Sequence, residues 1–111
     1  MGLMSVNYAI EHSINTVAVK ALLDVGIENS FEFCKNKLGF NLKGDDKNEA
    51  PLALGQLTDG ESLLNVTNAY SMLANGGTLA KPRSYYYVTD NYGNILYEYK
   101  YKNEYPFIER L

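Results

Sequence analysis

The sequence predicts a mainly α-helical chain that ends in a β-hairpin, an α+β arrangement. In the predicted helices between residues 5 and 77 apolar residues recur at three- and four-residue steps, which is the period of a helix with one buried face. Over residues 78–103 the spacing changes to two, and β-prone tyrosines alternate with other residues. We therefore expect one domain over residues 1–111, with a helical part followed by the hairpin.

Composition narrows the function classes. The chain has 111 residues, of which 46% are hydrophobic and 21% charged, so it can bury a core. Its formal net charge of -3 argues against a nucleic-acid binder, which needs a basic face. One cysteine and one histidine exclude an internal disulfide and a zinc site. Gly76 and Gly77 follow a predicted helix instead of preceding one, so no phosphate-binding loop is present. We expect no cofactor, metal or nucleic acid.

Two helices are predicted before residue 26. Ser5 is placed to cap a short first helix. A second begins near Ile14 and ends at Gly26. Ser and Asn favour caps and breaks, so the polar residues between them predict a break at about Ser13. The expected apolar stripe of the second helix is Ile14, Val17, Ala18, Ala21, Leu22 and Val25.

The middle of the chain predicts one helix and a long loop. Phe31 and Cys34 lie on the buried side of a helix over residues 27–38, and Gly39 is suited to end it. Cys34 is therefore expected to be a buried, unreactive thiol. Residues 41–61 are polar and turn-rich, and Pro51 precludes a continuous helix there.

The next helix is predicted over residues 62–75. Thr58 and Ser62 compete as its cap, and Ser62 is favoured because Gly60 would otherwise fall in the first turn. Its apolar stripe is expected to be Leu63, Val66, Tyr70 and Leu73.

The predicted hairpin joins residues 85–89 to residues 95–101 through a turn at residues 90–94. The chain has ten tyrosines and no tryptophan, and most of the tyrosines fall here. On the second strand Ile95, Tyr97, Tyr99 and Tyr101 share one face. Such a ladder could stack sugars or bases, but cross-strand packing in a half-buried hairpin is the favoured interpretation.

The best candidates for chemistry are the polar residues Glu11, His12, Ser13 and Asn15. Ser-x-Asn before a helix is most often only a cap. The sharper hypothesis is that a hydroxyl and an amide project together into a cleft, where one relays a proton and the other binds a carbonyl. A base–nucleophile pair of His12 and Ser13 is disfavoured, because adjacent residues seldom face each other on a helix.

A second polar cluster is a weaker candidate for a functional site. Asp45, Asp46 and Glu49 lack the spacing of a calcium loop, so a solvated loop is expected.

Several segments together resemble one family. Ala9 to Lys20, AIEHSINTVAVK, resembles the segment around the second active-site motif, Ser-x-Asn, of bifunctional class A penicillin-binding proteins. Leu52 to Gly55 resembles the family's Leu-Ala-Leu-Gly element, and Gly60 to Gly77 resembles its next helix with an Ala-Asn-Gly-Gly ending. The hairpin follows through Lys81-Pro82, Asp90, Gly93 and Leu96-Tyr97-Glu98. The resemblance covers almost the whole chain in order.

The resemblance implies a helical subdomain fragment of the penicillin-binding protein and β-lactamase-like fold. The parent enzyme would be a membrane-anchored D,D-transpeptidase, with its catalytic domain outside the cytoplasmic membrane. It would cross-link peptidoglycan stem peptides through a serine acyl-enzyme, which β-lactams would also form. The position matching Ser13 would relay protons, and the position matching Asn15 would hold the acyl side chain's amide.

Departures from the family limit what the chain alone can do. Ser62-Leu63 stands where the family often has Thr-Pro, which affects capping only. No serine here is followed three residues later by lysine, and no lysine begins Lys-Thr-Gly or Lys-Ser-Gly. The isolated chain, a partial domain, is therefore expected to be inactive and not to bind penicillin covalently. It shows no signal or transmembrane segment.

Two further expectations follow. Without the sheet that these helices cover in the family, the chain would expose an apolar patch and self-associate. The alternative function is a stand-alone, non-catalytic interaction module that uses the tyrosine-rich hairpin as a docking face.

Overall fold

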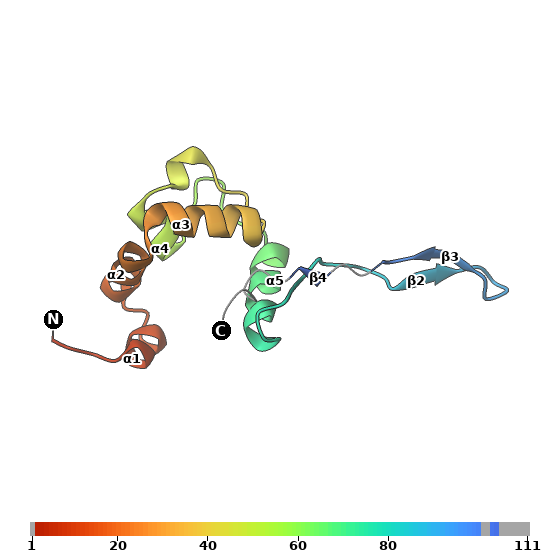
Figure 1. Cartoon of the computed structure of the whole chain (residues 1–111), viewed down its shortest axis with the longest axis horizontal. Coiled ribbons are helices and arrows are strands. Elements are labelled where there is room, and N and C mark those ends of the chain that lie inside the picture. The colour runs from red at the N-terminus through yellow and green to blue at the C-terminus, as the bar shows by residue number, and fades with distance from the viewer. Residues whose placement is uncertain (1, 101–102, 105–111) are drawn as a thin grey trace. The chain divides into compact units, whose positions relative to one another are not determined.

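The helices at the N-terminus begin and end where the sequence predicts. The computed structural model describes residues 2–100 and 103–104, and α1 is Val6–Glu11 (Figure 1). The Ser5 hydroxyl caps it by accepting the Tyr8 N–H at 3.2 Å. After a break around Ser13, α2 runs over Asn15–Val25. Gly26 ends it at a φ of 96°, a conformation that disfavours other residues.

The predicted helix over residues 27–38 forms in two parts. It begins as α3, Ile27–Glu32, and continues as a π-helical turn, η1, over Phe33–Lys37. Phe31 is its buried side chain. The ammonium groups of Lys35 and Lys47 lie 5.4 and 5.6 Å from the centre of the Phe31 ring. Both groups therefore make cation–π contacts with this ring.

The expected loop over residues 41–61 contains two short helical segments. A 3-10 turn, η2, covers Gly44–Asp46, and α4 covers Glu49–Leu54. No continuous helix spans these residues, as predicted, but the expectation of a loop throughout is wrong, because α4 includes Pro51. Pro51 is the third residue of α4, and the first four N–H groups of a helix have no intrahelical partner, so its missing donor costs nothing. The α4 helix packs against α2 and α3, close to them in Figure 1.

Asp46 is fully buried, which corrects the solvated loop expected for the acidic cluster. One carboxylate oxygen accepts the Lys43 N–H at 2.7 Å. The other accepts the N–H and the hydroxyl of Thr58, both at 2.7 Å. Asp45 and Glu49 are exposed, as expected. Asp46 thus joins the start of η2 to a segment twelve residues later in the chain.

These contacts make stability pH-dependent. Hydrogen bonds from the Lys43 N–H and from Thr58 lower the pKa of Asp46 below its usual value. A folded-state pKa below the unfolded one gives stability that is present above the unfolded pKa and lost as the pH falls through the folded pKa. We expect the melting temperature to fall below about pH 4, and Asp46→Asn to flatten that acid limb. Thermal melts across pH 2–7 test this; an unchanged acid limb in Asp46→Asn would contradict it.

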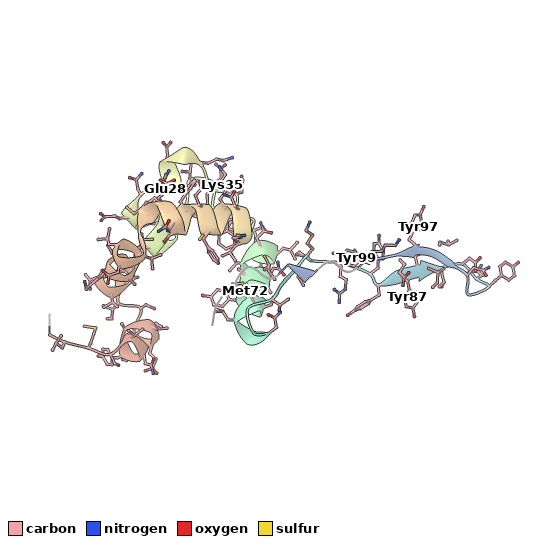
Figure 2. The ribbon with its side chains drawn as sticks, in the orientation of Figure 1. Glu28, Lys35, Met72, Tyr87, Tyr97 and Tyr99 are labelled. Atoms are coloured by element: carbon pink, nitrogen blue, oxygen red, sulfur yellow. The ribbon has the colours of Figure 1, made fainter. Side chains whose placement is uncertain are left out.

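The chain divides into two compact units, Met1–Glu61 and Ser62–Leu111. The second unit begins with α5, Leu63–Ala74. Ser62 caps it, as predicted, by accepting the Asn65 N–H at 3.1 Å. The predicted buried stripe is wrong, because Leu63, Tyr70 and Leu73 are 82%, 69% and 73% exposed. Met72 is the buried side chain instead (Figure 2). The apolar stripe is therefore an uncovered face of α5.

Among the described residues, four short strands follow α5. As predicted, β2 (Tyr87–Thr89) and β3 (Ile95–Glu98) form an antiparallel hairpin, although shorter than expected. The turn is closed by the Gly93 N–H, which donates to the Asp90 carbonyl at 3.1 Å. A second antiparallel pair, β1 (Leu79–Ala80) with β4 (Asn103–Glu104), was not predicted. About half of the described chain is thus helical, and a small antiparallel hairpin follows the helices, in agreement with the α+β arrangement that the sequence predicts.

The hairpin is not half-buried, which corrects the packing expected for its tyrosines. Every residue of β2 and β3 is exposed, and the side chains of Tyr87 and Tyr97 extend from opposite sides of the ribbon in Figure 2. Tyr99 is partly buried. Tyr101 lies outside the described residues. Both faces of the hairpin are therefore available to a ligand.

No helix in the part of the chain that the structure describes is long and apolar enough to cross a membrane.

Candidate functional site

Ser13 occupies a strained position in the connection between α1 and α2. Its φ is 50°, and it is the only described residue other than glycine with a positive φ. For an L-residue this left-handed conformation costs roughly 1–2 kcal/mol. The connection holds it there, because the Ser13 N–H donates to the Ile10 carbonyl at 3.2 Å and the Ile14 N–H to the Ala9 carbonyl at 2.9 Å. Strain of this kind often marks a functional position.

The structure does not use Ser13 as a helix cap. The N-cap of α2 is Ile14, which has no side-chain capping bond, and Asn15 is the first helical residue. A serine that only capped the helix would accept an N–H of the first turn. The common interpretation of a Ser-x-Asn sequence as a cap therefore does not explain this serine.

Ser13 and Asn15 line one hollow of about 380 Å³ between α1, α2 and α4. They are its only polar residues among the described residues that line it. The apolar lining is Val6, Ala9, Ile10, Ile14, Val17, Ala18, Ala21, Ala53 and Leu54. A concave apolar surface with a few convergent polar groups is the usual form of a ligand site.

This hollow explains only part of the predicted stripe of α2, because Val25 is 61% exposed and does not line it. Leu22 is buried, whereas Val17 is partly exposed, and Ala18 and Ala21 are exposed where they line the hollow. Sequence analysis missed Ala53 and Leu54, because residues 41–61 were expected to be a loop. The signal that could have found them is a short apolar run between Asn48 and Gly55, two residues that favour helix ends.

His12 and Glu11 do not join Ser13 in the hollow. His12 stacks on Tyr8, with ring centres 3.9 Å apart and planes 17° apart. Its Nδ1 lies 2.9 Å from the Tyr8 carbonyl, and because a carbonyl only accepts, Nδ1 carries the proton. His12 thus completes the C-terminal end of α1, and Glu11 is exposed. Neither residue lines the hollow.

Cys34 and the acidic residues do not form a second candidate site in the part of the chain that the structure describes. Cys34 is partly buried, and that burial raises the pKa of its thiol, so the reactive thiolate is disfavoured. No three His, Cys, Asp or Glu side chains come together as a metal site among residues 2–100 and 103–104. The pair Ser13 and Asn15 is therefore the candidate site.

Known proteins align with most of the chain. It is 34% identical to penicillin-binding protein 1A of Clostridium novyi (strain NT) over 100 residues, which are 89% of this chain and 12% of the relative. It is 33% identical to penicillin-binding protein 1A of Clostridium tetani over 107 residues. That match covers 90% of this chain and 13% of the relative.

A third relative is penicillin-binding protein 4 of Bacillus subtilis (strain 168). It is 32% identical over 101 residues, or 91% of this chain and 16% of the relative. No protein-family model matches the chain. The chain thus spans only a small part of the length of these relatives.

Proposed function

Because this chain is homologous to penicillin-binding proteins along about nine-tenths of its length, we propose that it is part of a peptidoglycan D,D-transpeptidase domain. In that domain it would supply the second active-site motif, Ser13-x-Asn15. The nucleophilic Ser-x-x-Lys and the Lys-Thr-Gly motif would come from other parts of the protein, since these 111 residues contain neither.

The observation that carries the proposal is the placement of Ser13 and Asn15 in one hollow. All other described residues that line it are apolar, so these two groups are the ones that can orient a polar substrate there. The Ser13 hydroxyl can both donate and accept a hydrogen bond, as a proton relay requires. The Asn15 amide can donate to a substrate carbonyl and accept from a substrate N–H.

The chemistry assigned to this arrangement is acyl transfer. The nucleophilic serine attacks the carbonyl of the stem peptide's terminal D-Ala-D-Ala bond, and its proton passes to the neighbouring lysine. Ser13 relays a proton to the leaving nitrogen as the peptide bond breaks, which frees the terminal D-Ala and leaves an ester on the serine. An amine of a second stem peptide then attacks the ester, forms the cross-link and releases the serine.

The same proposal accounts for inhibition by β-lactams and for where the complete protein acts. A β-lactam would acylate the same serine, with its ring nitrogen as the leaving group that Ser13 protonates. The complete protein would act at the outer side of the cytoplasmic membrane, held by an anchor. The isolated chain would be inactive and would self-associate through uncovered apolar surface, of which α5 carries a share at Leu63 and Leu73.

The reading frame and a labelled penicillin test the proposal. We expect Ser-x-x-Lys upstream of Met1 and Lys-Thr-Gly or Lys-Ser-Gly downstream of Leu111 in the complete reading frame. Fluorescent penicillin should then label the complete protein in denaturing electrophoresis and leave the 111-residue chain unlabelled. Stop codons directly on both sides, or a labelled band from the isolated chain, would overturn the proposal.

A further inference from the structure

One face of the β2–β3 hairpin collects tyrosine rings. In the ladder Val88 lies opposite Tyr97. The Tyr99 N–H donates to the Tyr86 carbonyl at 2.8 Å, which extends the ladder beyond Tyr87 and Glu98. Opposite residues share a face and successive residues alternate. Tyr86, Tyr97 and Tyr99 therefore lie on one face, which with Arg83 we term the aromatic face.

Arg83 fixes two of these rings. Its guanidinium carbon lies 4.3 Å from the centre of the Tyr86 ring and 5.8 Å from that of Tyr99. A hydrogen bond from Arg83, and then its charge, lower the pKa of Tyr86. Cation–π contacts of this kind hold rings in place before a ligand arrives. Arg83 therefore holds two of the three rings of the aromatic face without a ligand.

The aromatic face carries positive charge and no carboxylate from β2 or β3. Glu98 is the only carboxylate within β2 and β3, and it pairs with Tyr87 on the other face. Arg83 supplies a positive charge beside the rings. The face is thus complementary to a ligand that combines flat apolar surface with negative charge.

The size of the face favours a slender ligand over a folded partner. Tyr86 and Tyr97 are 69% and 68% exposed. Since a tyrosine buries 150–250 Å² when covered, the three rings offer roughly 300–400 Å². A standard protein interface buries about 800 Å² per partner, or about twice as much. A second copy of this chain would not be held by this face alone.

We propose that the aromatic face binds an acidic glycan strand, a chain of sugar rings whose peptide substituents bear carboxylates, as in peptidoglycan. The C–H faces of the sugars stack on Tyr97 and Tyr99, and the phenol hydroxyls bond to sugar hydroxyls. Arg83 attracts the carboxylates. The choice of peptidoglycan rests on the proposed function. The binding itself requires no catalytic residue.

A nuclear magnetic resonance titration of the 111-residue chain tests this inference. The probe is a soluble N-acetylglucosaminyl-N-acetylmuramyl-peptide, and chitotetraose is the neutral comparison. We expect saturable shifts in β2 and β3, and affinity for the muropeptide that exceeds that for chitotetraose. Tyr97→Ala should weaken binding roughly tenfold, in proportion to one lost stacking contact, and Tyr97→Phe should keep most of it. Arg83→Gln should weaken the muropeptide more than chitotetraose, because it removes the positive charge as well as the contacts with Tyr86 and Tyr99.

The matched control is Tyr87→Ala. Tyr87 is 61% exposed in the same hairpin but lies on the other face, so its removal should change binding less than twofold. Equal losses in Tyr87→Ala and Tyr97→Ala, equal affinity for both probes, or no saturable shift would each overturn the inference.

Folding and function are separated in the same experiment. The ladder resonances of each variant show whether the hairpin is intact, and Tyr97→Phe keeps the test valid if Tyr97→Ala unfolds it. Stop codons flanking the chain would defeat the proposed function and leave a measured glycan affinity standing. Catalytic motifs in the flanking frame without muropeptide binding would defeat this inference alone.

Discussion

Replacing Ser13 by glycine is expected to slow β-lactam acylation of the complete protein by about 10²–10⁴-fold, the usual contribution of a positioned proton-transfer group. Glycine adopts a φ of 50° without strain, so the connection between α1 and α2 should keep its geometry. The strain released is offset by the greater freedom of glycine in the unfolded chain, so stability should change by no more than about 1 kcal/mol. Activity and stability are thereby separated.

Stopped-flow acylation by a chromogenic β-lactam, with thermal melts of the same variants, measures both quantities. Ser13→Ala should lose acylation to the same degree, because it also lacks the hydroxyl. Ser71→Ala is the matched control: that hydroxyl donates to the Asn68 carbonyl at 2.7 Å, on α5. Acylation within twofold of the parent in Ser13→Gly would eliminate the proton-relay role.

Replacing Phe31 by alanine is expected to destabilise the first unit, Met1–Glu61, by about 3–5 kcal/mol. Phe31 is 5% exposed and has the largest side chain among the buried apolar residues of that unit, which otherwise are Ala9, Leu22 and Leu42. Its loss also removes the ring that Lys35 and Lys47 cover. Domains are typically stable by only 5–15 kcal/mol, so this loss would be a large fraction of the unit's stability.

Urea unfolding followed by circular dichroism, with amide exchange to locate the loss, tests this expectation. Leu23→Ala is the control, because Leu23 is 49% exposed on α2, and such surface changes usually cost less than about 0.5 kcal/mol. Amides of α2, α3 and α4 should lose protection in Phe31→Ala, whereas the β2–β3 hairpin should not. Similar unfolding midpoints for the two variants would show that Phe31 is not central to the core.

The sequence predicts local structure well where one residue decides it. The caps Ser5 and Ser62, the break at Ser13 and the end at Gly26 are confirmed, because each depends on hydrogen bonds or backbone freedom within a few residues. The short α4 differs from the loop that the polar, turn-rich sequence over residues 41–61 predicts, and Pro51 is harmless at its third helical position.

Burial was harder to predict because it depends on distant partners. Nothing near Asp46 in the sequence shows that Thr58, twelve residues later, satisfies its carboxylate. The stripe of α5 was expected to be buried because it is apolar, but periodicity does not say whether a neighbour covers it. The exposed hairpin tyrosines illustrate the same limit.

The sequence predicts which two residues are the candidates, but not the residues that surround them. Ser13 and Asn15 came from the Ser-x-Asn pattern. That the two residues line the same hollow depends on Ala53 and Leu54 of α4, which the sequence placed in a loop. The catalytic roles of the two residues remain predictions.

The pairing of β1 with β4 bears on how this region can change in evolution. Leu79 faces Glu104 and Ala80 faces Asn103, so the chain leaves and returns at neighbouring points. The β2–β3 hairpin lies within this connection, so we expect that it can be lengthened, shortened or exchanged without moving β1 and β4. Related proteins can accordingly vary in this ribbon while they keep α5 and β1, and a short engineered turn between Ala80 and Asn103 should be tolerated.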